Sequence, residues 1–412
     1  MMNGRSTLKA VIERSKKSPG EQRMDRRIAH LDMDAFYASV ELLRYPHLRG
    51  LAVVIGGRQA LRSLADQHNG NFARLREYAG RGVVTTATYE ARAFGIHSAM
   101  GLMKAATLAP DAILLPADFD QYRHYSRLFK AAVARIAPQI EDRGIDEVYI
   151  DLTEVPGETA AVARQIKDTV RRATSLSCSI GIAPNKLLAK LASELDKPNG
   201  LTMLSPADLP RRIWPLAVGK LNGIGPKTSA KLNAMGIHML GDLAAAVPGV
   251  LIEAFGERHG RWLSDAAHGH DTSPVVTVRE PRSLSRETTF ERDLHPTEDR
   301  PLLSGILLDL CERLHGDLAR KGYRGKTVGI KIRFADFHTV TRELTLETDI
   351  AAAAEIRRAA RACLRRVALD RKIRLLGVRV GTLSPEGMHR ETPDLFSTAD
   401  RTEPDSCLLF DG

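Results

Sequence analysis

The stretch H-L-D-M-D-A-F-Y-A-S-V-E, residues 30–41, decides the fold of the first part of the chain. Its first residues alternate in polarity. Leu31 and Met33 share one face, while Asp32 and Asp34 share the other. A period of two predicts a strand that turns one face toward a core and carries two carboxylates on the opposite face.

This strand, expected over 27–35, is followed after a long excursion by elements that can pair with it. We expect a helix at 120–136, a strand at 145–152, a helix at 158–174, a strand at 177–183 and a helix that begins at Pro184. The order strand, helix, strand, helix, strand is typical of an α+β sheet of the split βαβ type. Residues 38–112 would then be an excursion from that sheet.

The rest of the chain changes pattern twice. Residues 205–273 are expected to be helical with short Gly-containing turns, and a second small α+β domain follows. In that domain we expect an initial strand, a helix near 299–321, a long strand region at 326–347, a helix at 350–367 and a strand at 374–382. The residues from 386 onward are acidic and rich in Pro, Ser and Thr, which predicts disorder.

Charge narrows the class of partner. The 412 residues carry a formal net charge of +10, although the last 27 hold seven acids against two bases. The remaining body is therefore more basic still, and its positive field suits a polyanion such as nucleic acid. Aromatic residues are only 5% of the chain, so phosphate contacts are expected to outweigh base stacking.

Other classes are excluded. The four cysteines lie far apart without zinc spacing, which argues against a disulfide framework or a structural zinc site. No apolar run approaches the ~18 residues of a membrane span, and the first 26 residues lack the apolar core of a secretory signal. We expect a cytoplasmic protein with no membrane association.

Carboxylates occur where two strands are predicted. Asp32 lies in the first, and Asp146 and Glu147 lie in G-I-D-E-V-Y-I-D-L, residues 144–152. Three carboxylates converging from two strands can hold two hard cations, an arrangement that serves phosphoryl transfer. In a regular strand Asp146 and Glu147 would point to opposite faces, so a bend beside Gly144 is required. Solvated acids at strand ends are the alternative.

Two further segments contain groups suited to phosphate. In T-T-A-T-Y-E-A-R-A-F-G, residues 85–95, the hydroxyl of Tyr89 and the guanidinium of Arg92 can hold one triphosphate. The alternative is a helix start with a surface arginine. Lys197, in D-K-P-N-G at 196–200, is either another phosphate contact or a lysine that complements a helix C-terminus.

The segment K-L-N-G-I-G-P-K-T-S-A-K-L, residues 220–232, predicts two helices joined by a tight turn. The backbone N–H groups of Gly223 and Gly225 would be free to meet a phosphate, and Pro226 would start the second helix beside Lys227. This is a helix-hairpin-helix pattern, which contacts the DNA backbone without reading sequence. An ordinary turn between two helices is the alternative.

Taken together, these segments resemble the Y-family of DNA polymerases, and within it the DNA polymerase IV branch. The likeness runs from about residue 27 to 382 in the correct order, and includes G-I-A-P-N-K-L-L-A-K-L-A-S-E-L-D-K-P-N-G at 181–200. It implies an α+β multidomain, right-hand polymerase with a ferredoxin-like palm, small fingers, a helical thumb and an α+β little-finger domain.

The resemblance also implies domain boundaries. They are a basic flexible extension at 1–26, a palm at 27–37 and 113–204, fingers at 38–112 with an insertion at 58–80, a thumb at 205–273, a linker at 274–282, a little finger at 283–385 and an acidic tail at 386–412.

The resemblance further assigns the metal ligands. By matching position, Asp32, Asp146 and Glu147 would hold two Mg²⁺ ions, with the carbonyl of Met33 as a backbone ligand. Family usage selects Asp32 over Asp34, a choice that alternation along the strand leaves open.

Nucleotide contacts are implied in the same way. Thr86, Tyr89, Arg92 and Lys197 would hold the incoming dNTP by its triphosphate. Tyr37 falls at the steric gate, where an aromatic ring fills the space that a ribose 2′-hydroxyl needs. A half-buried tyrosine packed on the palm is a compatible interpretation of the same residue.

The implied activity is template-directed, error-prone translesion synthesis, in which dNTPs are added to a primer 3′-hydroxyl by two-metal-ion transfer without proofreading. A non-catalytic relative that binds primer–template DNA is one alternative, but it would be expected to lose carboxylates. A nucleotide cyclase is another. The hairpin at 220–232 and the basic domain at 283–382 argue against it, because a cyclase needs no duplex grip.

Two short peptides in the tail resemble the sliding-clamp peptide of bacterial polymerases. They are T-P-D-L-F at 392–396 and S-C-L-L-F at 406–410, which place Leu395 with Phe396 and Leu409 with Phe410. Neither begins with the usual Gln. The expected partners are therefore primer–template DNA, dNTP and a sliding clamp, with the protein itself a monomer.

Overall fold

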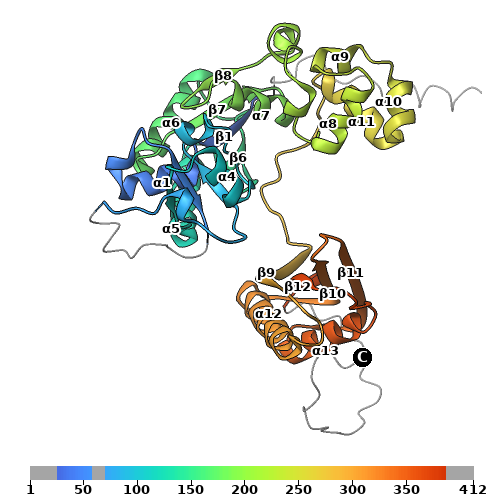
Figure 1. The fold of residues 1–412 in the computed structure, drawn as a ribbon. Coiled ribbons are helices and arrows are strands. Elements are labelled where there is room, and N and C mark those ends of the chain that lie inside the picture. Colours follow the sequence, from blue (N-terminus) through green and yellow to red (C-terminus); the bar gives the residue numbers. More distant parts are fainter. Residues whose placement is uncertain (1–25, 58–69, 387–412) are drawn as a thin grey trace, which may run out of the picture. The chain divides into compact units, whose positions relative to one another are not determined.

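The computed structural model describes residues 26–57 and 70–386. These form two compact units, divided between Val278 and Arg279, and each is described by itself (Figure 1). Most of the predicted N-terminal extension, residues 58–69 of the predicted insertion, and the tail peptides lie outside the described residues. The same holds for the clamp candidates Leu395, Phe396, Leu409 and Phe410.

A five-stranded sheet is the centre of the first unit. Its strands are β1 (Ile28–Met33), β5 (Ile140–Asp142), β6 (Glu147–Asp151), β7 (Cys178–Ala183) and β8 (Leu201–Met203). They lie in the order β5-β6-β1-β7-β8, and β1 is antiparallel to both of its neighbours. This is the predicted split βαβ arrangement, with β8 added parallel to β7.

One face of this sheet forms the main core. Leu31 and Met33 are buried there, as the alternating pattern predicted, and pack with Phe129 and Ile166. The helices that cover this face are α5 (Phe119–Ala134) and α6 (Thr159–Thr174). Each runs close to its predicted range, because an apolar stripe at helical spacing needs a sheet face to bury it.

The opposite, polar face of the sheet is covered by α7 (Lys186–Leu195). This helix begins two residues after Pro184, because the side chain of Asn185 accepts a hydrogen bond from the N–H of Leu188 and caps the first turn. Its contact with β7 is unusually close. A Cβ on Gly181 would lie 2.2 Å from the backbone oxygen of Ala189, so only glycine fits.

A smaller sheet lies in the excursion between β1 and α5. It contains β2 (Val53–Gly56), β3 (Val84–Ala87) and β4 (Ile113–Leu115), with helices α1 (Phe36–Arg44), α3 (Tyr89–Arg92) and α4 (Leu102–Leu108). The strand order is β3-β2-β4, and β4 runs parallel to β2. The sheet thus extends three residues beyond 112, the predicted end of the fingers.

Short helices follow β8, as expected for residues 205–273. They are α8 (Pro226–Ala234), α9 (Leu240–Ala245), α10 (Pro248–Phe255) and α11 (Glu257–Ala267). Leu232, Leu243, Leu251 and Leu263 are fully buried between them. Together with the leucines of α7 they form the second core of this unit.

The chain after α11 remains attached to the first unit. Glu141 is fully buried, and its carboxylate accepts hydrogen bonds from the ammonium of Lys186 and, at 3.0 Å, from the N–H of Val276. Lys186 also donates to the carbonyl of Pro274 at 3.2 Å. The first residues of the predicted 274–282 linker are therefore fixed, because leaving a buried carboxylate unpaired is costly.

The second unit is a four-stranded antiparallel sheet packed with two helices. Its elements are β9 (Ser283–Leu294), α12 (Arg300–Lys321), β10 (Tyr323–Phe334), β11 (Thr339–Ile350), α13 (Ala353–Leu364) and β12 (Ile373–Pro385). The order is β11-β10-β12-β9. The strand region expected at 326–347 is a hairpin, since the N–H of Phe334 bonds the carbonyl of His338 across a turn.

Among the helices that the structure describes, none is long and apolar enough to cross a bilayer.

The close packing at Gly181 generates a prediction. Gly181→Ala should lower the free energy of unfolding by about 1–3 kcal/mol, because the added methyl group forces α7 away from β7. Gly249→Ala is the control, since a Cβ there meets nothing within 4 Å in α10 and should be neutral or stabilising. Denaturant unfolding of both variants tests this, and equal stability of Gly181→Ala and the native chain would contradict it.

Candidate active site

Three carboxylates meet where β1 and β6 lie side by side. Asp32 pairs directly with Glu147 across the two strands, so both side chains project from the same face. Asp146 precedes β6, and its carbonyl accepts a hydrogen bond from the N–H of Met33 at 3.0 Å. Asp146 is therefore outside the regular strand, which removes the expected alternation. A Cβ on Gly144 would lie 3.6 Å from both acidic side chains that follow it.

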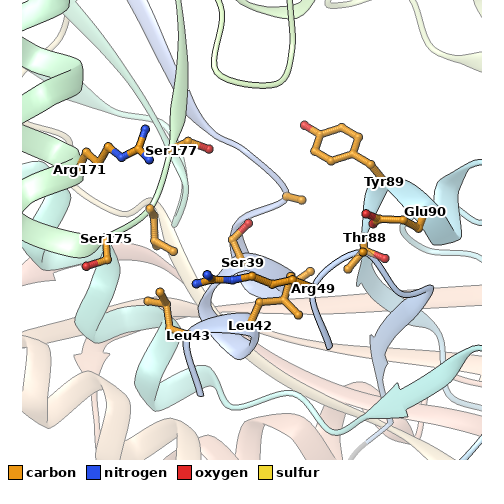
Figure 2. Close-up of a pocket in the computed structure, with 14 residues that line it drawn as sticks. Ser39, Leu42, Leu43, Arg49, Thr88, Tyr89, Glu90, Arg171, Ser175 and Ser177 are labelled. Carbon is orange, nitrogen blue, oxygen red and sulfur yellow. The ribbon is translucent and has the colours of Figure 1, made fainter. Parts of the chain in front are cut away.

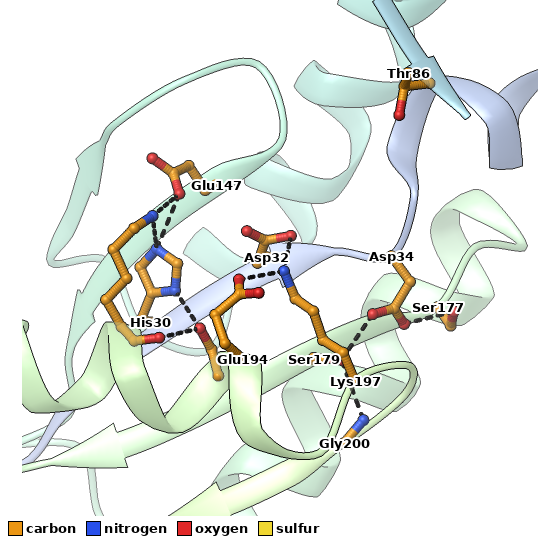
Figure 3. A network of polar contacts seen from close by, with 12 residues as sticks. His30, Asp32, Asp34, Thr86, Glu147, Ser177, Ser179, Glu194, Lys197 and Gly200 are labelled. Carbon is orange, nitrogen blue, oxygen red and sulfur yellow. Dashed lines mark hydrogen bonds and ion pairs between the residues drawn. The ribbon is translucent and has the colours of Figure 1, made fainter. Parts of the chain in front are cut away.

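Two lysines neutralise these acids (Figure 3). The ammonium of Lys197 lies 2.9 Å from a carboxylate oxygen of Asp32. Glu147 accepts hydrogen bonds from the ammonium of Lys190 and, at 3.2 Å, from the imidazole of His30. In the described ranges, no group of three His, Cys, Asp or Glu side chains is arranged to hold a metal ion.

His30 holds one side of Glu147 in place. The imidazole is fully buried, and its Nδ1 lies 2.8 Å from the hydroxyl of Ser193 in α7. Burial lowers the pKa of His30, although the hydrogen bond to Glu147 acts against this. His30 therefore links the strand, the helix and one carboxylate.

Asp34 has a different environment from Asp32. Its carboxylate is buried and accepts hydrogen bonds from the hydroxyls of Ser177 and Ser179, both at 2.7 Å, and from the N–H of Asn199 at 2.8 Å. These bonds tie the end of β1 to β7 and to the loop that carries Lys197. Asp34 thus has a structural role, which supports the choice of Asp32 as the carboxylate open to a ligand.

The pKa values of Asp32 and Asp146 reflect burial first and their charged neighbours second. Burial raises the pKa of Asp32 to about 6, against the opposing effect of Lys197. Burial and the neighbouring Glu147 also raise the pKa of Asp146. The hydrogen bond from His30, together with Lys190, lowers the pKa of Glu147 to about 2 despite its partial burial. Added positive charge would therefore be favourable at Asp32 and Asp146.

The end of β3 and the helix α3 that follows it bring Thr86, Tyr89 and Arg92 together. Thr88 caps α3 and bonds both the carbonyl of Leu51 and the N–H of Val53, at 3.0 Å each, which fixes the start of the helix. Arg92 lies 4.9 Å from the ring centroid of Tyr89, and its guanidinium donates to Thr86 at 3.4 Å.

The hydroxyl of Tyr89 is a buried polar group without a hydrogen-bond partner in the part of the chain that the structure describes. Burial raises the pKa of this tyrosine, and the negative charges of Asp34 and Asp32 contribute. The Tyr89 hydroxyl therefore remains a neutral donor close to the acidic site, and an orphaned donor of this kind favours an incoming acceptor.

A cavity of about 380 Å³ adjoins Tyr89 on the side of α1 and α6. Figure 2 shows Arg171 and Ser175 on one wall, Thr88 to Glu90 on the opposite wall, and Arg49 between them. Neither arginine was singled out by the sequence, because isolated surface arginines carry no pattern.

Tyr37 stands at the start of α1 against an aromatic cluster. Its ring stacks on Tyr122 with centroids 4.3 Å apart and meets Phe119 edge to face at 5.9 Å. Burial raises its pKa, with a contribution from the charge of Asp146. Tyr37 is thus a half-buried ring, held rigidly, beside the carboxylates.

The helix predicted to follow the hairpin turn is α8, and it begins at Pro226 as expected. Gly223 has a φ of 106°, and a Cβ there would lie 2.6 Å from the ring of Trp262, so glycine is required. Among the described residues, the N–H groups of Gly223 and Gly225 have no hydrogen-bond partner. Lys227 is exposed beside them.

Sequence reasoning missed His30, Lys190 and Glu194. A helix from Pro184 was expected, but its charged residues Lys186, Lys190 and Glu194, spaced by four, were not used. That spacing places the three on one helix face, where Lys190 pairs with Glu147 and Glu194 with Lys197.

Comparison with known proteins follows the same division of the chain. Residues 31–194 match the model of the impB/mucB/samB family, and residues 281–392 match the C-terminal domain of that family. Residues 206–237 match the IMS family HHH motif.

The curated relatives are similar over nearly their whole length. A DNA polymerase IV of Alkalilimnicola ehrlichii is 38% identical over 374 residues, which cover 90% of this chain and 97% of that protein. A DNA polymerase IV of Methanoculleus marisnigri is 39% identical over 360 residues, covering 87% and 94%.

Among solved structures, a chimeric Y-family DNA polymerase matches with a TM-score of 0.72, covering 86% of this chain and 98% of its own. At 24% identity it supports the fold alone, and it confirms the predicted right-hand polymerase class. The predicted resemblance to DNA polymerase IV is confirmed by the relatives. The chain therefore belongs to the impB/mucB/samB family, together with these DNA polymerase IV proteins.

Proposed function

We propose that this chain is a template-directed DNA polymerase that adds dNTPs to a primer 3′-hydroxyl and copies damaged templates with low fidelity. The observation that carries the proposal is the direct pairing of Asp32 with Glu147, beside Asp146, in a chain whose relatives are DNA polymerase IV proteins. No separate nuclease site was found in the sequence, so the activity is proposed to lack proofreading.

The three carboxylates suit divalent cations. All are oxygen donors, and Asp32 and Glu147 each bind an ammonium group, which supports an affinity for positive charge at both. Asp32, Asp146, Glu147 and the carbonyl of Met33 would hold two Mg²⁺ ions. When bound, such ions make the 3′-hydroxyl more acidic and balance the charge on the departing pyrophosphate.

Four residues near the acids would hold the nucleotide: Thr86, Tyr89, Arg92 and Lys197. Tyr89 offers its unpaired hydroxyl, Arg92 a planar fork of donors next to Thr86, and Lys197 a point charge close to Asp32. The ammonium of Lys197 can leave its ion pair with Asp32 and bind a phosphate oxygen of the nucleotide instead. Burial alone would lower the pKa of Lys197, but Asp32 and Glu194 together raise it, so the ammonium stays charged.

Tyr37 is proposed to select the sugar. Its ring is held between Tyr122 and Phe119, so it cannot move aside for a 2′-hydroxyl without breaking those contacts. A ring in this position would clash with the 2′-hydroxyl of a ribonucleotide, and the chain would therefore prefer deoxyribonucleotides.

The primer–template duplex would be bound by residues other than the three carboxylates. The N–H groups of Gly223 and Gly225, with Lys227, suit a backbone phosphate, which fixes position without reading sequence. We also propose that the second unit binds DNA, because residues 283–382 are basic.

The non-catalytic and cyclase alternatives are less favoured. All three acidic side chains remain in place, and the hairpin turn gives a grip on DNA that a cyclase does not need. We further propose a cytoplasmic monomer that binds a sliding clamp through Leu395 with Phe396 or Leu409 with Phe410.

The metal site gives the first test. Asp146→Ala with Glu147→Ala should reduce primer extension with Mg²⁺ and dNTPs by at least about a thousandfold, because the acids stabilise charge that develops in the transition state. Asp168→Ala, an exposed acid on α6, is the matched control and should extend normally. If the native chain fails to extend but binds primer–template DNA, the accessory alternative replaces the polymerase proposal.

The sugar gate gives the second. Tyr37→Ala should raise incorporation of ribonucleotides relative to deoxyribonucleotides by roughly tenfold or more, because the blocking ring is gone. Tyr37→Phe keeps the ring and should keep the discrimination. Single-nucleotide insertion kinetics with paired dNTP and rNTP substrates measure both, and unchanged discrimination in Tyr37→Ala would remove this residue from the gate.

The tail gives the third. Deleting residues 386–412 should leave basal synthesis intact but abolish stimulation by a sliding clamp, because the apolar Leu-Phe pairs are lost. Paired alanine variants at Leu395 with Phe396 and at Leu409 with Phe410 identify which peptide acts. Equal stimulation of the full and shortened chains, measured by processive extension, would exclude the tail.

A further inference from the structure

A groove of about 480 Å³ runs between α7 and the hairpin turn. Lys190, Leu191 and Glu194 form one wall, and residues 219–225 form the other. Lys190 reaches the acidic site from this groove, since its ammonium bonds Glu147. The opposite wall carries the unpartnered N–H groups of the turn, so the groove joins two places suited to the same nucleic-acid strand.

Lys190 and Lys186 show that the lysines of α7 have different roles. Lys186 pairs with Glu141, and their side chains are 11% and 0% exposed, which is a closed structural ion pair. The side chains of Lys190 and Glu147 are 22% and 24% exposed. The pair that Lys190 makes can therefore open without unfolding the core, whereas that of Lys186 cannot.

The ammonium of Lys190 and a divalent cation compete for the negative charge of Glu147. Glu147 directs one carboxylate oxygen at both Lys190 and His30, so that oxygen is already occupied. A cation at that oxygen must displace Lys190, and a cation at the other oxygen of Glu147 is repelled by the Lys190 charge. A displaced Lys190, on its flexible stem, then needs another anion. Glu194 lines the same groove but is already paired with Lys197, so a strand phosphate entering the groove beside Lys220 is the anion that the inference assigns to Lys190.

We propose that Lys190 is a positioning residue that exchanges Glu147 for a phosphate of the primer strand. Binding of the strand in the groove draws the ammonium away, and the freed carboxylate becomes available to a divalent cation. DNA binding and metal binding are then coupled, and each strengthens the other by the same factor. The inference deepens the proposed polymerase function, on which it rests for the identity of the strand.

The predicted competition between Lys190 and a divalent cation is tested without catalytic turnover. Mn²⁺ binding to the full chain is measured by electron paramagnetic resonance, with no nucleotide present. Lys190→Met removes the competing charge and keeps the apolar stem, so the DNA-free variant should bind Mn²⁺ at least about fivefold tighter than the native chain. Primer–template DNA ending in a dideoxynucleotide should tighten Mn²⁺ binding to the native chain and have less effect on the variant.

The predicted contact between Lys190 and a DNA phosphate is tested by measuring how primer–template affinity depends on salt concentration. Lys190→Met should reduce the slope of log K against log salt concentration by about 1, the value for one lost phosphate contact. Lys190→Arg keeps the charge and should keep the slope. Lys220→Met is the matched control: Lys220 lines the same groove but makes no contact with Glu147, so it should lower the slope and leave DNA-free Mn²⁺ affinity unchanged.

Two outcomes overturn the proposal. One is a DNA-free Mn²⁺ affinity that Lys190→Met leaves within twofold of the native value, and the other is an unchanged salt slope. Primer extension by the native chain is measured separately. A native chain that binds DNA and Mn²⁺ in this coupled way but does not extend a primer would refute the polymerase function and retain the exchange.

Discussion

The acidic site depends on the close approach of α7 to β7 at Gly181. A Cβ there would lie 2.2 Å from backbone atoms of Ala189 and Ser193, so any other residue would push the helix off the sheet. This contact brings Lys190 and Ser193 over the polar face of β1. Without it, His30 would lose its partner in the helix, and Glu147 would lose one of its two donors.

The same packing controls the balance of charge. Asp32, Asp146 and Glu147 would repel one another if they stood alone in a half-buried place. Lys190 and Lys197 supply compensating charge from the helix and from the loop that follows it. Among the described residues, Lys190 forms an ion pair with Glu147 alone, whereas Lys197 is shared between Asp32 and Glu194.

Sequence reasoning was most accurate where a regular period could be read. The alternation around Leu31 and the apolar stripes of α5 and α6 placed those elements within a few residues of their observed limits. It was less exact at irregular backbone. The strand expected at 145–152 begins at Glu147, after a bend at residues 144–146 of the kind that the two adjacent acids required. The long strand region expected at 326–347 is two strands joined by the turn before His338.

The sequence by itself determined the fold class, the family and most of the candidate residues, because strand and helix periods and the order of motifs are local properties of the chain. Only the tertiary structure decided how these residues act on one another. It separated Asp34, whose oxygens are taken by Ser177, Ser179 and the N–H of Asn199, from the accessible Asp32. It also joined Lys190 to Glu147, 43 residues apart in the chain, because hydrogen bonds and ion pairs depend on distances in space.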